Sequence, residues 1–121
     1  MTTSSLTLHE ICALAHEALL NAGANTEHAD AVADVVTRAE RDGSHSHGLF
    51  RIPGYVASLR SGKVKGDADP TLSKRSPVVL HCDGDLGYAP LAHRRSLTAL
   101  AEAAKENGLA TLSLTRTHHF A

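Results

Sequence analysis

The chain has 121 residues, of which 42% are hydrophobic and 3% aromatic, so it fits one domain or a part of a larger one and excludes two ordinary domains. Twelve Lys and Arg against thirteen Asp and Glu give a net charge of −1, which argues against a nucleic-acid partner or an acidic membrane surface. No stretch approaches the roughly 18 apolar residues of a membrane span and no leader pattern opens the chain, which favours a cytoplasmic location. Cys12 and Cys82 fit neither a metal-binding spacing nor a disulfide framework, and we expect both thiols to be buried and reduced.

Two amphipathic helices are predicted at the N-terminal end. Thr7 and Glu10 have the spacing of a capping box, and apolar residues then recur on one helical face over residues 8–22. A second helix begins at a cap formed by Asn25 or the residue after it, and Gly43 ends it. We expect these two helices to pack as a hairpin.

A short third helix is expected after the small, polar residues 43–48, since Pro53 suits the first turn of a helix and Gly62 ends it. Residues 63–77 carry glycine, proline and mixed charge, which indicates a surface connection with room for one short strand.

The C-terminal half is predicted to form a strand, a helix and a second strand. Residues 78–82 are a β-branched run that enters a turn over residues 83–87, where we expect glycine to take a positive φ and the two aspartates to act as turn formers. A helix then ends at Gly108, and residues 109–115 alternate apolar and polar side chains as a strand does.

The expected fold class is therefore α/β (α+β), in three parts. Residues 1–62 form the helical segment, residues 63–77 the connection, and residues 78–121 the start of an α/β unit. The chain stops directly after its last strand, which would leave a bare sheet edge. We therefore expect an incomplete fold, the front part of a longer protein.

The densest group of chemically useful side chains lies in residues 44–51. If the helix begins near Ser46, His47 and Arg51 stand four residues apart on one face and can converge on one small molecule. Arg51 could grip a carboxylate through two parallel hydrogen bonds, while an imidazole exchanges protons near neutral pH. Gly48 would leave room for a ligand. The alternative is that Ser46 caps a helix, His47 is half-exposed and Arg51 makes a surface pair, since motifs this short recur by chance.

Nine histidines stand out in this composition, but their spacing does not predict a metal site. His45 and His47 alternate and His118 and His119 are adjacent, and neither pair has the spacing of a zinc-binding HExxH motif. The single histidines on the predicted helices are interpreted as solvated: His16, His28 and His93.

Several short elements follow one another in an order typical of one known family. They are Arg41-Asp42-Gly43, Ser46-His47-Gly48, Arg51-Ile52-Pro53, Tyr55, Gly62, Asp83-Gly84, Gly87 and His119-Phe120. The chain resembles the type 2 malate/L-lactate dehydrogenases over nearly its whole length. That resemblance implies an NAD(P)H-dependent oxidoreductase of 2-oxo acids or cyclic imino acids with a non-Rossmann fold, in keeping with the lack of a GxGxxG motif. The local sequence is most similar to that of reductases of Δ1-piperideine-2-carboxylate and Δ1-pyrroline-2-carboxylate.

The resemblance also implies a role for each matching residue. His47 would be the acid-base residue, Ser46 its relay neighbour, and Arg51 the group that binds the substrate carboxylate. A loop that binds NADPH or NADH would begin with His119, Phe120 and Ala121, the last in place of the family's usual glycine.

Family members are much longer, so the relay aspartate and most of the nicotinamide-binding part are expected beyond Ala121. The resemblance further implies a small carboxylate substrate and a homodimer. The alternative from another class is a non-catalytic fragment or assembly module, which the abrupt C-terminus suggests.

Overall fold

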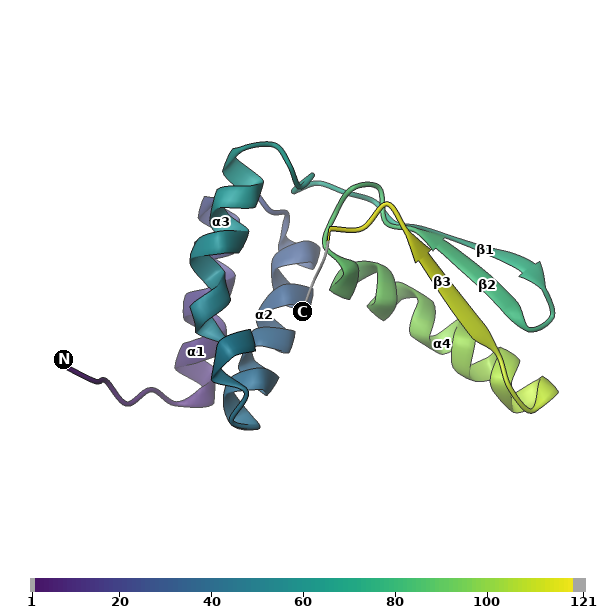
Figure 1. Cartoon of the computed structure of the whole chain (residues 1–121), viewed down its shortest axis with the longest axis horizontal. Coiled ribbons are helices and arrows are strands. Elements are labelled where there is room, and N and C mark those ends of the chain that lie inside the picture. The colour runs from purple at the N-terminus through teal and green to yellow at the C-terminus, as the bar shows by residue number, and fades with distance from the viewer. Residues whose placement is uncertain (1, 119–121) are drawn as a thin grey trace.

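The computed structural model describes residues 2–118 and shows the mixed α/β fold that the sequence predicts, with a helical part and a sheet part (Figure 1). The helical part contains α1 (Leu8–Asn21), α2 (Thr26–Arg41) and α3 (Ile52–Arg60). The sheet part contains β1 (Thr71–Ser76), β2 (Val79–Asp83), α4 (Ala89–Asn107) and β3 (Thr111–Thr115). The two parts meet where α2 packs against α4. None of the helices in these described residues is long and apolar enough to cross a membrane.

The first two helices form the expected hairpin, and their starts are fixed by side-chain caps. The Thr7 hydroxyl accepts a hydrogen bond from the Glu10 amide, and the Glu10 carboxylate accepts one from the Thr7 amide, at 3.1 and 2.7 Å. Asn25 caps α2 by accepting from the His28 amide at 2.9 Å. These bonds satisfy amide groups that have no partner within their own helix, so both helix starts are confirmed.

The sheet has the order β1-β2-β3, with β1 antiparallel and β3 parallel to β2. α4 packs against the sheet, and Leu80 and Cys82 of the central strand are buried while the alternate positions of that strand are half-buried (Figure 1). This alternation and the parallel pairing confirm the predicted strand-helix-strand unit. Strand β1 lies within the predicted connection, where room for one short strand was expected.

The turn after β2 departs from the sequence-based prediction. Positive φ angles fall on Asp85 (53°) and Leu86 (65°), and not on the two glycines of the turn. The glycines are needed for close approach instead: a Cβ at Gly84 would lie 2.3 Å from the Thr117 side chain, and one at Gly87 would lie 2.5 Å from the His28 ring. Backbone therefore passes so close to its neighbours at both positions that a side chain has no room.

Two predictions of side-chain burial are wrong. His28 was expected to be solvated, but only 1% of it is exposed, because it lies under the turn beside Gly87. Cys12 is only half-buried, on the helical hairpin, whereas Cys82 is buried as expected, and both thiols are free.

Candidate active site

The segment that carries Ser46, His47 and Arg51 is not the continuous helix that the sequence suggested. Two single 3-10 turns, η1 (His45–His47) and η2 (Leu49–Arg51), precede α3, and Gly48 separates them with φ −94° and ψ −137°. The Glu40 side chain of α2 lies against Gly48: a Cβ there would come within 2.1 Å of Glu40 Oε1. Gly48 therefore makes room for a carboxylate of this chain, and not for a ligand as predicted.

His47 is half-buried, and its ring is fixed by the preceding residue. Ser46 Oγ lies 3.0 Å from His47 Nδ1. The Ser46 hydroxyl occupies the Nδ1 side of the ring, so Nε2 is the nitrogen left to exchange a proton with a bound molecule. It donates from the imidazolium, and it accepts in the neutral ring whose Nδ1–H donates to Ser46 Oγ.

Arg51 is anchored to the same residue as His47. Its Nε donates to the Ser46 carbonyl oxygen at 2.8 Å, and its backbone amide donates to the Gly48 carbonyl oxygen at 3.0 Å. Its two terminal nitrogens have no ion-pair partner among residues 2–118 and can still form a two-pronged contact with a carboxylate. The structure thus ties His47 and Arg51 to one residue, Ser46, although two 3-10 turns replace the expected helical turn.

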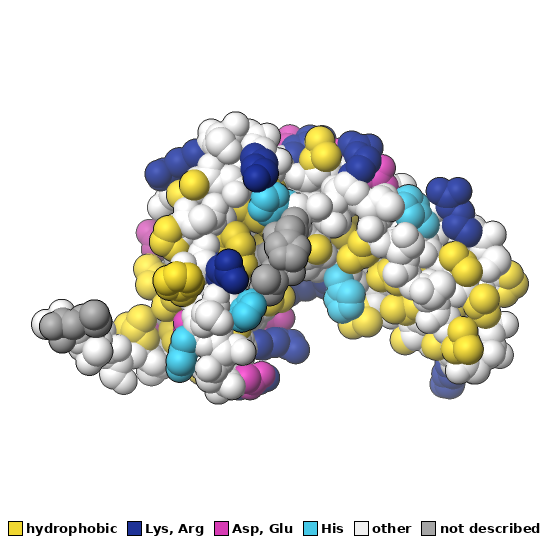
Figure 2. Space-filling view, viewed as in Figure 1, with side chains coloured by type: hydrophobic (Ala, Val, Ile, Leu, Met, Phe, Trp, Pro, Cys, Tyr) yellow, Lys and Arg dark blue, Asp and Glu magenta, His cyan; other side chains and the backbone are white. Residues whose placement is uncertain are grey.

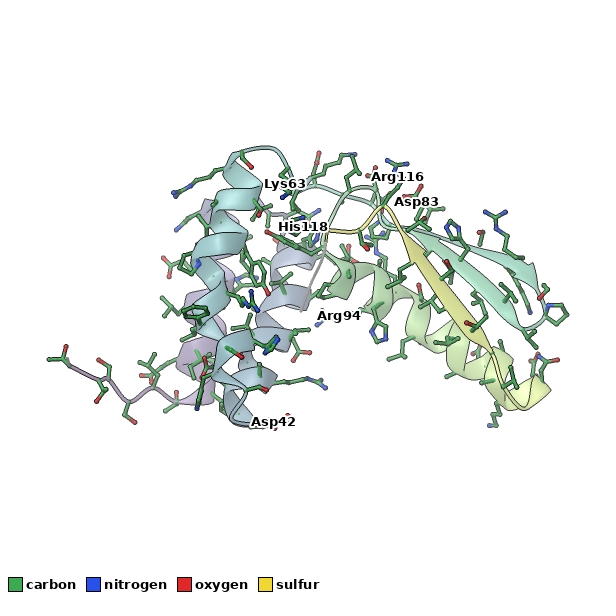
Figure 3. The ribbon with its side chains drawn as sticks, in the orientation of Figure 1. Asp42, Lys63, Asp83, Arg94, Arg116 and His118 are labelled. Carbon is green, nitrogen blue, oxygen red and sulfur yellow. The ribbon has the colours of Figure 1, made fainter. Side chains whose placement is uncertain are left out.

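A second group of side chains lies where the helical part meets the sheet part, close to His118 (Figure 3). The buried Tyr88 ring makes edge-on contacts with three rings, at centroid distances of 5.5 Å to His28, 5.3 Å to Tyr55 and 5.6 Å to His118. The Tyr88 hydroxyl donates to the Tyr55 carbonyl oxygen at 2.7 Å. Because α2, α3 and the segment after β3 each contribute one of these rings, Tyr88 fixes the position of His118 relative to the helices.

His118 is the last described residue and lies directly before the predicted cofactor loop. Its amide donates to the Gly87 carbonyl oxygen at 2.7 Å, and two further bonds of this kind join residues 84–86 to residues 115–116. The three predicted cofactor residues themselves lie outside the described part of the chain: His119, Phe120 and Ala121.

The two aspartates of the turn act as turn formers, as predicted. Asp83 Oδ1 accepts from the Asp85 amide at 2.8 Å, and Arg116 pairs with Asp83 at 3.0 Å (Figure 3). The Lys65 ammonium, 2.7 Å from Asp85, is the main reason why the pKa of that carboxyl lies below its ordinary value. Both carboxylates are engaged in fixing the backbone, which leaves neither poised for proton transfer.

The face shown in Figure 2 carries separate histidine side chains, spread over the helical part, the junction and the sheet part. Within residues 2–118, no group of three or more His, Cys, Asp or Glu side chains is arranged to hold a metal ion.

Sequence reasoning missed His28 and Glu40, the two polar residues that matter most on α2. His28, Val32, Val36 and Glu40 follow one another at intervals of four, so all four lie on one face of the helix. His28 Nε2 accepts from the Tyr88 amide at 2.8 Å, and burial lowers the pKa of this imidazole. The period of four in the sequence was the signal that could have placed both residues on the packed face.

Comparisons with known proteins show the family to which this chain belongs. The family model described as malate/L-lactate dehydrogenase matches residues 6–121. The Delta(1)-pyrroline-2-carboxylate reductase of Ancylobacter novellus is 48% identical over 115 residues, which cover 95% of this chain and 34% of that protein. A Delta(1)-pyrroline-2-carboxylate/Delta(1)-piperideine-2-carboxylate reductase of Pseudomonas aeruginosa is 37% identical, with coverage of 95% and 34%.

Solved structures give the same result. The crystal structure of delta1-piperideine-2-carboxylate reductase from Pseudomonas syringae matches with a TM-score of 0.94 and 36% identity, over 98% of this chain and 36% of that one. Malate dehydrogenase from Pyrococcus horikoshii matches with a TM-score of 0.87 at 24% identity, over 98% of this chain and 34% of that one, which shows a shared fold. The chain spans about a third of the length of the curated relatives it matches. It belongs to the malate/L-lactate dehydrogenase family.

Proposed function

We propose that this chain supplies the proton-transfer and carboxylate-binding groups of a nicotinamide-dependent reductase that acts on a small 2-oxo acid or a cyclic 2-imino carboxylate. Membership of the family and the names of the curated relatives support this reaction class. The cyclic imines Δ1-pyrroline-2-carboxylate and Δ1-piperideine-2-carboxylate are the substrates we favour. In this proposal residues 1–62 carry the substrate-facing groups, residues 63–77 connect, and residues 78–121 begin the cofactor-binding part.

His47 is the proposed acid-base residue, with Ser46 as its relay neighbour. Reduction of a C=N or C=O bond adds a hydride to carbon and a proton to nitrogen or oxygen. With Ser46 Oγ 3.0 Å from Nδ1, the imidazolium form of His47 donates its Nε2 proton to the substrate and becomes a neutral imidazole whose Nδ1–H donates to Ser46 Oγ. In the reverse direction the same nitrogen accepts the proton.

Arg51 is the proposed binder of the substrate carboxylate. Its Nε is held by the Ser46 carbonyl oxygen at 2.8 Å, so the guanidinium plane is fixed while its terminal nitrogens stay available. A two-pronged contact at the carboxylate would set the orientation of the neighbouring C2 atom relative to His47, and orientation of this kind is a large part of catalysis.

NADPH or NADH, when bound, supplies the hydride. The residues proposed to contact it are His119, Phe120 and Ala121. The position of the residue that precedes them supports this assignment. His118 is held by the Gly87 carbonyl oxygen and the Tyr88 ring at the junction of the helical and sheet parts. A homodimer and a cytoplasmic location stay predictions.

The observation that best supports the proposal is that Ser46 contacts both His47 and Arg51. Its hydroxyl orients the His47 ring and its carbonyl oxygen orients Arg51, so that a proton donor and a carboxylate binder are fixed to one residue. The arrangement fits a substrate with a reducible bond next to a carboxylate.

The test follows the absorbance of reduced nicotinamide with Δ1-pyrroline-2-carboxylate, Δ1-piperideine-2-carboxylate and pyruvate. It uses the 121-residue chain and, where the reading frame continues past Ala121, the extended chain. We expect cofactor oxidation with at least one cyclic imine, and abolition of that activity by His47→Ala. If neither form oxidises NADPH or NADH with any of the three compounds, the proposal fails.

A further inference from the structure

Glu40, near the end of α2, is a carboxylate that the proposed reaction does not use. Only 15% of its side chain is exposed, which is unusual for an acidic residue. Oε2 lies 2.6 Å from His45 Nδ1, and Oε1 accepts the Leu49 amide at 2.9 Å. The hydrogen bond from His45, followed by that from Leu49, holds the pKa of Glu40 below its ordinary value. Glu40 is therefore a charged acceptor at neutral pH.

The two bonds reach both 3-10 turns that carry the proposed site. His45 belongs to η1, the turn that ends with His47, and Leu49 begins η2, the turn that ends with Arg51. Between them the carboxylate occupies the space that a side chain at Gly48 would need, 2.1 Å from the position of a Cβ. One side chain from α2 thus bridges the break between the two turns.

The neighbouring charged groups do not compete for this carboxylate. Arg41 is the adjacent cation, and its Nε and terminal nitrogen bind the Asp42 carboxylate at 2.7 and 3.0 Å. Among residues 2–118, the Glu40 carboxylate is hydrogen-bonded by the His45 side chain and by the backbone amide of Leu49.

We propose that Glu40 is a positioning residue, which clamps η1 and η2 together so that His47 and Arg51 face the same substrate. This inference rests on the proposed reductase function. The 3-10 turns are short and have weaker hydrogen-bond geometry than an α-helix, so an external anchor is needed to hold them in one arrangement. Misplacement of a reacting group by about 1 Å lowers turnover by roughly a hundredfold.

The variants separate the two halves of the clamp. Glu40→Ala removes both bonds, and we expect a lower kcat together with a higher KM because both turns are released. His45→Ala removes only the η1 bond and should lower kcat while KM for the carboxylate substrate stays close to the wild-type value. Glu40→Gln keeps an oxygen that accepts the Leu49 amide, so it should restore KM. Glu17→Ala, an exposed glutamate on α1, is the matched control and should leave both constants unchanged.

A second measurement reports on the clamp without activity. Hydrogen exchange of the Leu49 amide in the 121-residue chain should become faster in Glu40→Ala and stay slow in Glu40→Gln and Glu17→Ala. Circular dichroism and thermal unfolding confirm that each variant is folded. If Glu40→Ala does not fold, the comparison of Glu40→Gln with His45→Ala still tests the predicted split between kcat and KM.

The outcomes distinguish this inference from the proposed function. An active wild-type protein whose Glu40→Ala variant has the kinetic constants of the Glu17→Ala control overturns the inference alone. Equal losses in Glu40→Gln and Glu40→Ala with unchanged KM also overturn it. A wild-type protein without reductase activity in either form overturns the proposed function, and the inference with it.

Discussion

Lowering the pH should destabilise this fold through His28, the buried imidazole of α2. Its Nε2 accepts the Tyr88 amide at 2.8 Å, so that nitrogen must be unprotonated in the folded state. Burial lowers the pKa of His28, and nearby backbone groups offset this effect only in part. Glu27 raises this pKa and Arg95 lowers it, and these two charges pair with each other, so their effects oppose.

The sign of the pH dependence follows from the lowered pKa. As the pH falls, the unfolded chain takes up the His28 proton before the folded chain does. The stabilising contribution is complete above the unfolded value of about 6.5 and is lost as the pH falls through the folded-state pKa. Within that window, one proton taken up on unfolding lowers the free energy of unfolding by up to about 1.4 kcal/mol per pH unit.

Urea unfolding of the wild type and of His28→Gln between about pH 5 and pH 8 measures this effect. Glutamine keeps an oxygen that can accept the Tyr88 amide but does not titrate, so the fall in stability toward acid should become shallower. His93→Gln, on an exposed part of α4, is the matched control and should keep the wild-type slope. Identical slopes for the wild type and His28→Gln would refute the reasoning.

Four further substitutions test the packing, a helix end and the surface ion pairs. Gly87→Ala should lower the free energy of unfolding by about 1–3 kcal/mol, because the new Cβ would lie 2.5 Å from the His28 ring. Gly54→Ala, on the open surface of α3, should raise the free energy of unfolding by roughly 0.4–1 kcal/mol. Similar shifts of the urea midpoint in the two variants would contradict this account. Gly108→Ala should lower the free energy of unfolding by about 1 kcal/mol, since the residue ends α4 at φ +88°, and an unchanged melting temperature would count against it. Arg95→Ala removes exposed ion pairs to Glu27 and Asp69 and should lower the free energy of unfolding by at most about 1 kcal/mol. The loss should be smaller at high salt, and a larger loss that does not change with salt would show that these pairs are not screened.

Local signals were sufficient for most of the fold. The capping box at Thr7 and Glu10, the cap at Asn25 and the stop at Gly108 depend on neighbours a few residues away, and the structure confirms each of them. The strand-helix-strand unit was also readable, because a period of two and a period of nearly four are properties of the sequence itself.

Features that depend on distant residues were not predictable in this way. Gly84 and Gly87 looked like glycines of positive φ, but their cause is the close approach of Thr117 and His28. The lack of room for a side chain at Gly48 likewise reflects Glu40, a residue of the preceding helix. A glycine in a sequence does not reveal whether φ or packing demands it.

The sequence predicted which residues of the candidate site lie together better than it predicted how they are arranged. Ser46 and His47 are in contact and Arg51 joins them, yet the connection runs through the Ser46 carbonyl oxygen and not through a helical turn. Their catalytic roles, and those of the three residues after His118, stay predictions.

The central claim is that His47 transfers the proton while Arg51 holds the carboxylate. Steady-state kinetics of His47→Ala and Arg51→Ala with Δ1-pyrroline-2-carboxylate, in the form of the protein that shows activity, test it most directly. We predict that His47→Ala lowers kcat by roughly a hundredfold or more with little change in KM, and that Arg51→Ala acts mainly by raising KM. A His47→Ala variant that keeps the wild-type kcat would contradict the claim.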